Sequence, residues 1–205
     1  LDIYKEVDSM QEIKRSFIGS GIRYDLLLHR YADDHLNKAA HTYMEELIAR
    51  HVSGRLKVAP EHTESNVLKM MRKPSFELFG QFKKIFDRVN KQNGLNQQLI
   101  PYFISSHPGC TEVDMANLAI QTKKLHFQLE QVQDFTPTPM TLATEMYYTG
   151  YHPYTLEKVY TARTKEQKLA QRQFFFWYKP EFRRQITQAL QKIGKKDLIG
   201  KLFGK

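Results

Sequence analysis

The chain has 205 residues, of which 41% are hydrophobic and 26% charged, and its formal net charge at pH 7 is +9. This length and composition suit one globular domain, or one domain with an appendage. A run of about eighteen apolar residues, which a membrane-spanning helix needs, does not occur. The single cysteine, Cys110, excludes an internal disulfide and a metal site made of cysteines alone, and it favours a reduced, cytoplasmic setting.

The positive charge is concentrated at one end of the sequence. Residues 151–205 hold 13 Lys and Arg against 4 Asp and Glu, whereas residues 1–150 hold 18 of each kind. This shift predicts a first domain over residues 1–150 and a basic helical extension over residues 151–205. Because the chain begins with Leu1, inside an amphipathic pattern, we interpret it as a piece of a longer protein.

The first half of the sequence repeats one rhythm, a β-type run followed by a helix. Residues 15–24 form the first run, and the helix after it begins at Asp33-Asp34 and ends before Gly54. Residues 55–59 form the second run. It is followed by a short helix capped by Thr63 and by a longer helix that Pro74-Ser75 opens.

The rhythm continues with a third run over residues 98–104, followed by a helix that Thr111 caps. The fourth run covers residues 131–135 and precedes a short helix over residues 140–148. In the tail, a helix is predicted over residues 180–193, with a further turn at residues 197–203.

Strands that alternate with helices of this length predict βαβ units and a parallel sheet. Four such units cannot close an eight-stranded barrel. The predicted fold is therefore α/β, with about four parallel βα units and a C-terminal α-helical extension, and the four units could be one side of a larger barrel or an open sheet. A cut barrel leaves an unpaired strand, so we expect self-association through that edge of the sheet.

Ligands of parallel α/β sheets bind beyond the carboxyl ends of the strands. In this sequence, polar residues stand just after the predicted strands. These residues suit a small polar nucleotide with an amino-acid tail. Arg23 can bind a carboxylate, Glu61 can accept hydrogen bonds from ribose hydroxyls, and Ser106 with its backbone can contact a polar purine edge. The candidate binding residues are Arg23, Glu61, His62, Ser106, His107, Pro108 and Thr136.

Each of these features also has a purely structural interpretation. Arg23 can pair with Asp25, Glu61-His62 can be capping polar residues of a solvated loop, and His107-Pro108 can simply form a turn with the glycine after it. Cys110 is expected to be a small buried or loop residue, because no base is evident beside it. The sequence contains no metal-binding motif, and we expect no metal ligand within this chain.

Four motifs, taken in order, resemble the YgiQ-type (UPF0313) radical SAM proteins, and the resemblance covers nearly the whole chain, including the basic tail. These motifs are Gly19-Ser-Gly-Ile-Arg-Tyr-Asp-Leu26, Leu56-Lys-Val-Ala-Pro-Glu-His-Thr63 with Leu68-Lys-Met-Met71, Ile100-Pro-Tyr-Phe-Ile-Ser-Ser-His-Pro-Gly109, and Val132-Gln-Asp-Phe-Thr-Pro-Thr-Pro-Met140. More distantly, the same order is similar to the radical SAM methylthiotransferases. Those proteins carry Glu where this chain has Cys110, so no role for that acid is carried over.

The resemblance implies a partial (β/α) barrel of about four parallel βα units with a C-terminal α-helical extension. It also implies a radical SAM enzyme that cleaves S-adenosylmethionine (SAM) with a [4Fe-4S] cluster and acts on an unknown substrate. The cluster cysteines would lie upstream in a CxxxCxxC motif that this chain lacks, so the chain alone would be inactive. Glu61 and His62 would approach the ribose or methionyl part of SAM, and residues 104–108 would lie along the adenine. Thr136 would supply a backbone contact, and Arg23 would bind the methionyl carboxylate through two parallel hydrogen bonds.

Two alternatives need no catalysis by this chain. In the first, the basic tail with Phe174, Phe175, Phe176, Trp177 and Tyr178 binds RNA through phosphate charge and base stacking. The structural interpretation of the same residues is a helical appendage whose aromatic rings pack onto the barrel. In the second alternative, the chain is a structural module only.

Overall fold

A computed structural model describes residues 1–130 and 132–204, so Gln131, the first residue of the fourth predicted run, and Lys205 lie outside the described residues. The chain divides into two compact units, one made of Leu1–Ala59 and Glu77–Pro101 and the other of Pro60–Phe76 and Tyr102–Lys205. The fold is mixed α/β. Its described strands are β1 (Arg55–Glu61), β2 (Gln98–Ser105) and β3 (Val132–Asp134), which form one open sheet in the order β1-β2-β3.

Strands β2 and β3 run parallel, with Phe103 opposite Val132 and Ser105 opposite Asp134. Every second residue of β2 is buried, as the two-residue period of a strand dictates. The second, third and fourth predicted runs therefore form strands. The strand order makes β1 and β3 the outer strands of the described sheet, and self-association through such an edge stays a prediction.

The first predicted run does not form a strand, so that prediction was wrong. Within residues 15–24, only Ile22 pairs with the sheet, through a single parallel bridge to Val58. Gly19 and Gly21 precede Ile22 and weaken a strand because glycine loses the most backbone freedom on ordering. The ring of Phe17 is 47% exposed, so little burial offsets that loss. Among the described residues, three strands and the single bridge at Ile22 form an open sheet, so the predicted four-unit barrel is not confirmed.

In the first unit, the helices are α1 (Asp2–Ser9), α2 (Tyr24–Leu27), α3 (Asp34–Arg50) and α5 (Phe76–Gln92). Helix α3 begins where predicted, because the Asp33 carboxylate accepts a hydrogen bond from the His35 N–H. Helix α5 buries the predicted apolar stripe of Phe79, Phe82, Phe86 and Val89.

Two predicted helix boundaries were wrong. Thr63 does not cap α4 (Ser65–Met70), which begins after Glu64, and the Thr63 hydroxyl instead donates to the Glu64 carboxylate. Helix α3 ends at Arg50, ahead of Gly54, whose φ of +105° places its left-handed turn in the loop before β1.

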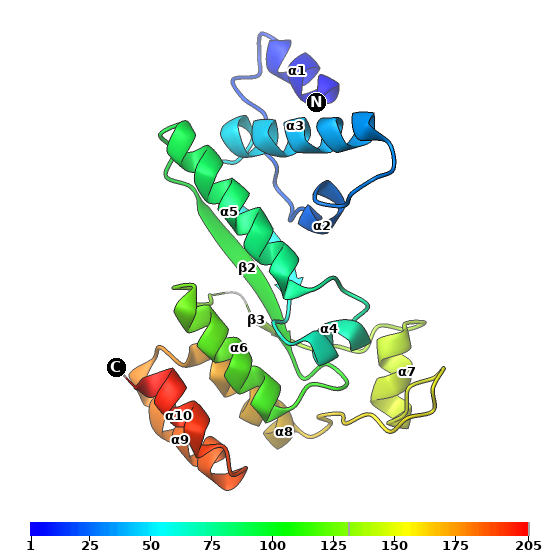
Figure 1. The fold of residues 1–205 in the computed structure, drawn as a ribbon, viewed down its shortest axis with the longest axis vertical. Coiled ribbons are helices and arrows are strands. Elements are labelled where there is room, and N and C mark those ends of the chain that lie inside the picture. The colour runs from blue at the N-terminus through cyan, green and yellow to red at the C-terminus, as the bar shows by residue number, and fades with distance from the viewer. Residues whose placement is uncertain (131, 205) are drawn as a thin grey trace. The chain divides into compact units, whose positions relative to one another are not determined.

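The second unit contains most of the remaining helices. They are α4, α6 (Glu112–Lys124), α7 (Leu142–Thr149), α8 (Lys165–Arg172), the 3-10 helix η1 (Gln173–Phe176), α9 (Pro180–Lys192) and α10 (Lys196–Phe203) (Figure 1). Thr111 caps α6 as predicted. Its hydroxyl accepts from the Asp114 N–H, and the Asp114 carboxylate accepts from the Thr111 N–H, which is a complete capping box. None of the described helices combines the length and the apolarity needed to cross a bilayer.

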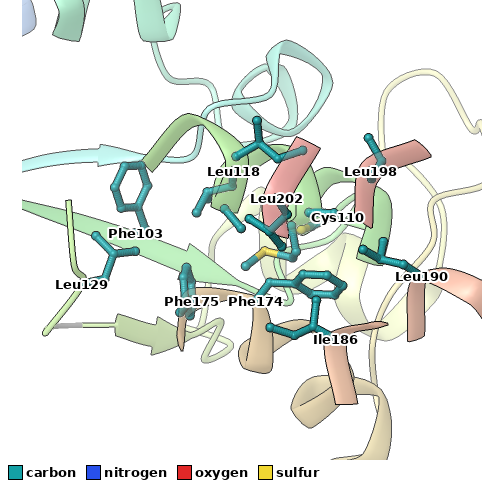
Figure 2. Packing of buried hydrophobic residues seen from close by; sticks show 14 of the residues in the cluster. Phe103, Cys110, Leu118, Leu129, Phe174, Phe175, Ile186, Leu190, Leu198 and Leu202 are labelled. Carbon is teal, nitrogen blue, oxygen red and sulfur yellow. The ribbon is translucent and has the colours of Figure 1, made fainter. Parts of the chain in front are cut away.

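The tail helices share a hydrophobic core with α6. Figure 2 shows Phe174 and Phe175 of η1 among side chains of α6, α9 and α10, and both rings are fully buried. Members of this core include Leu118, Ile186, Leu190, Leu198 and Leu202. The Trp177 indole N–H donates to the hydroxyl of Thr122 at 3.0 Å. The aromatic rings of Phe174 and Phe175 therefore pack into a core, as the structural interpretation predicted. The domain boundary near residue 150 stays a prediction.

Removing one buried ring should destabilise this core strongly. We expect Phe174→Ala to lower the free energy of unfolding by about 3–5 kcal/mol, because the change removes buried apolar surface and leaves a cavity. Urea denaturation measures this value. The control Leu169→Ala removes a side chain that is 53% exposed on α8, and its effect should stay within about 0.5 kcal/mol. Equal losses for the two variants would mean that Phe174 is not a core residue.

Candidate functional site

A pocket of about 450 Å³ lies in the second unit, at the carboxyl ends of the three strands. A volume in this range accommodates a small-molecule ligand. Glu61 ends β1, Ile104 lies near the end of β2, and Thr136 follows β3. The other lining residues are Met71, Lys73, His107, Gln133, Asp134, Phe135, Thr138, Thr141 and Ala143.

Glu61 has one carboxylate oxygen that is engaged and one that is not. Its Oε1 lies 3.2 Å from the Lys73 ammonium, whereas Oε2 is buried without a hydrogen-bond partner. The residue has a φ of +67°, a conformation that costs a non-glycine residue about 1–3 kcal/mol. Because a buried carboxylate oxygen without a partner is costly, Oε2 is suited to accept a hydrogen bond from a hydroxyl or amine of a ligand in the pocket.

Asp134 is the last residue of β3, and both of its carboxylate oxygens accept hydrogen bonds from protein groups. Its Oδ1 accepts a 2.6 Å hydrogen bond from the Ser105 hydroxyl, and its Oδ2 accepts one of 3.1 Å from the Arg172 guanidinium. Arg172 belongs to α8, so a residue of the basic tail neutralises an acid in the pocket wall.

His107 is a neutral member of the pocket lining. Its Nδ1 lies 2.9 Å from the Pro108 carbonyl oxygen, which can only accept, so Nδ1 carries the proton and Nε2 is left as an acceptor. Burial lowers the pKa of His107 to about 4 and outweighs the opposing effect of that hydrogen bond. The ring meets Phe135 edge to face, with 5.0 Å between centroids.

The structure places a base beside Cys110, contrary to the sequence-based expectation. The Cys110 sulfur lies 3.5 Å from Nε2 of His62, and His62 Nδ1 accepts from the Glu64 N–H, so the imidazole donates its Nε2–H to the sulfur. Burial lowers the pKa of His62 to about 3 and raises the pKa of the Cys110 thiol. Both groups are therefore neutral at pH 7, and the thiol is not an activated nucleophile.

The turn after β2 is fastened to the tail by one amide side chain. The Gln171 carbonyl oxygen accepts from the Ser106 N–H at 2.8 Å, and its amide N–H donates to the Cys110 carbonyl at 2.7 Å. Ser106 has a φ of +62°, and its buried hydroxyl has no hydrogen-bond partner. The Ser106 hydroxyl belongs to the interior of the turn, because Ser106 is not among the residues that line the pocket.

Three of the seven candidate residues, Glu61, His107 and Thr136, line the same pocket. His62, Ser106 and Pro108 lie next to them in the sequence and support the turns rather than the lining. Arg23 belongs to the first unit, where its guanidinium binds both carboxylate oxygens of Asp25 at 2.8 and 2.6 Å. That ion pair was one of the two interpretations left open for Arg23.

Sequence reasoning missed Lys73, Asp134 and Gln171. Lys73 follows the Leu68–Met71 motif and precedes Pro74, which places it in a loop that returns to the strand ends, and this signal was readable in the sequence. Gln171 carried no such signal, because its partners lie more than sixty residues away. Within the described ranges, no group of three or more His, Cys, Asp or Glu residues could hold a metal ion.

Comparison with known proteins finds relatives along the whole chain. The chain is 67% identical over 205 residues to a protein named "UPF0313 protein" from Bacteroides thetaiotaomicron. The matched region covers 100% of the chain and 33% of that relative. A "UPF0313 protein" from Porphyromonas gingivalis is 66% identical over 99% of the chain and 32% of its own length. The "UPF0313 protein YgiQ" of Escherichia coli strain K12 is 40% identical over 98% of the chain and 26% of its own length.

Residues 130–205 match a family described as "Domain of unknown function (DUF3362)". No solved structure matches the chain. The chain spans about a third or less of the length of these curated relatives.

The two buried histidines make stability depend on pH. Their folded-state pKa values, about 3 for His62 and about 4 for His107, lie below the usual 6.5, so the unfolded chain binds more protons between about pH 6.5 and 4. The free energy of unfolding should fall as pH falls through this window, by about 1.4 kcal/mol per pH unit for each histidine. Urea denaturation at several pH values should show a shallower slope for His62→Gln. The control His35→Gln changes an exposed histidine and should keep the parent slope. An unaltered slope in His62→Gln would contradict the burial of a neutral imidazole.

Proposed function

We propose, for a chain that belongs to the UPF0313 family, that the pocket at the strand ends binds SAM as part of a radical SAM enzyme. The observation that carries the proposal is the buried, unpartnered Oε2 of Glu61 in a pocket of about 450 Å³. It is supported by the resemblance of the strand-end motifs to radical SAM proteins.

The pocket offers groups that suit the parts of SAM. Glu61 can accept from a ribose hydroxyl, while Lys73 holds the other carboxylate oxygen and fixes the orientation of the group. Neutral His107 offers an acceptor nitrogen beside the Phe135 ring, a combination that suits the polar edge and the flat face of an adenine. Thr136 contributes the backbone at the end of β3. Assignment of the methionyl carboxylate to Arg23 stays a prediction.

The described residues of this chain do not fit an iron–sulfur cluster. They contain one cysteine, which is buried and neutral, and no metal-binding group of three donors. The proposal therefore assigns the cluster to residues outside this chain and gives this chain the task of binding and orienting SAM. In the radical SAM proteins that the sequence resembles, reductive cleavage of SAM supplies the radical that attacks the substrate.

Equilibrium binding of SAM to the full-length protein tests the assignment of Glu61. We expect Glu61→Gln to weaken SAM binding about tenfold, because one acceptor oxygen is replaced by a donor and a charged hydrogen bond is lost. Isothermal titration calorimetry under anaerobic conditions measures the affinity. In the control Glu46→Gln, an α3 acid paired with Arg50 is neutralised, and the affinity should be unchanged.

Two results would count against this function. Equal SAM affinity for Glu61→Gln and the parent would remove Glu61 from the site. A full-length protein that neither binds SAM nor releases 5′-deoxyadenosine under reducing, anaerobic conditions would favour the alternative of a structural module. RNA binding by the basic tail is a separate proposal.

A further inference from the structure

Exposed tyrosine residues lie at the end of α7 and in the segment that links α7 to α8. Tyr148, Tyr151, Tyr154 and Tyr160 are 67%, 50%, 77% and 44% exposed, and together they are called the tyrosine surface below. They contrast with Phe174 and Phe175, which are completely buried in the core of the same unit. Large aromatic side chains left in water over a short stretch of chain mark an interaction surface.

The loop that carries the central rings is internally ordered. Nδ1 of His152 accepts from the Tyr154 N–H at 3.3 Å and from the Thr155 N–H at 3.2 Å, and the Val159 N–H donates to the Gly150 carbonyl at 2.8 Å. Residues 151 and 158 form an antiparallel bridge across the loop. The backbone of the loop that carries these tyrosines is therefore ordered by hydrogen bonds.

The backbone at the two outer tyrosines is tied to neighbouring elements. The Tyr148 carbonyl accepts from the Arg163 guanidinium at 2.8 Å, which ties the end of α7 to the segment before α8. The Tyr160 carbonyl accepts from the Gly109 N–H at 2.8 Å, which ties the loop to the turn after β2. Figure 1 shows the loop beside α7, in agreement with these bonds. A backbone that is already ordered loses little entropy when a ligand binds to it.

Basic residues lie near these tyrosines in the sequence: Lys158 stands between Tyr154 and Tyr160, and Arg163 and Lys165 follow Tyr160. Residues 147–172 hold 5 Lys and Arg against 2 Asp and Glu, and Lys158, Arg163 and Lys165 are exposed. The Lys168 ammonium lies 5.3 Å from the centroid of the Tyr147 ring. Exposed flat rings with cations close by suit a single strand of nucleic acid, whose bases stack and whose phosphates carry charge.

We propose that the tyrosine surface binds single-stranded nucleic acid, with bases stacked on Tyr148 and Tyr154 and phosphates held by Lys158 and Lys165. A single strand of nucleic acid uses both kinds of group, because every base offers a face to stack on a ring and every phosphate offers a charge to a cation. The surface also lies near the pocket, because Thr141 and Ala143 at the start of α7 line the pocket and Tyr148 lies about 9 Å along the helix from Leu142.

Aromatic rings continue from the pocket to the surface. His107 meets Phe135 at 5.0 Å, Phe135 meets Tyr147 at 5.7 Å, and Tyr147 meets Tyr148 at 5.3 Å between centroids. A nucleic acid bound on the tyrosine surface would therefore lie at the rim of the pocket. This inference does not depend on SAM binding, and its test contains no SAM.

Fluorescence anisotropy with a fluorescein-labelled oligouridylate of about 12 nucleotides tests the proposal on the 205-residue chain. We expect Tyr148→Ala and Tyr154→Ala each to weaken binding about fivefold or more, because a stacking contact is lost. Tyr154→Phe keeps the ring and should keep the affinity. Binding should also weaken steeply as salt is raised, and less steeply in a Lys158→Ala/Lys165→Ala variant, because phosphate contacts release counterions.

Phe17→Ala is the matched control, since it removes a ring of similar exposure, 47%, from the first unit. Its affinity should equal that of the parent, and thermal melting of each variant confirms that it is folded. The proposal is overturned if the oligonucleotide does not bind, if the Tyr→Ala variants bind as well as the parent, or if Phe17→Ala loses as much affinity as they do.

Discussion

The double hydrogen bond of Gln171 is the constraint on which the rest of the second unit depends. One buried side chain from α8 satisfies a donor at Ser106 and an acceptor at Cys110, the two ends of the turn that connects β2 to α6. Buried backbone groups without partners are costly, so this bond holds the left-handed conformation of Ser106 in place. The buried core of α6, η1, α9 and α10 anchors the side that supplies Gln171.

The pocket follows from this arrangement. Since the turn after β2 is fixed, His107 is held against Phe135 at the same edge where Glu61 and Thr136 end their strands. The acids of the wall each have a basic partner, Lys73 for Glu61 and Arg172 for Asp134, so the pocket keeps its carboxylates without an excess of buried negative charge. Oε2 of Glu61 is left without a protein partner, and in the proposed function this oxygen accepts a hydrogen bond from SAM.

Much of this could be predicted from the sequence, and the failures have physical causes. Periodicity and capping residues located α3, α5 and α6, because these signals are local. The run over residues 15–24 failed as a strand because its β-type composition is interrupted by glycines. At the site, the rule that ligands bind at strand ends selected Glu61, His107 and Thr136, yet the burial of Ser106 and the contact between His62 and Cys110 depend on tertiary packing. The aromatic tail was ambiguous in sequence, since burial alone distinguishes a core ring from a stacking ring.

Amide hydrogen exchange at Ser106 in a Gln171→Ala variant tests the role of this side chain most directly. The Ser106 amide should exchange about tenfold faster or more than in the parent, because it loses its acceptor. Gln173→Ala, whose side chain donates only to the Ala170 carbonyl among the described contacts, should leave the Ser106 rate unchanged. Protection of Ser106 that is equal in the parent and in Gln171→Ala would contradict the claim that the tail holds the turn beside the pocket.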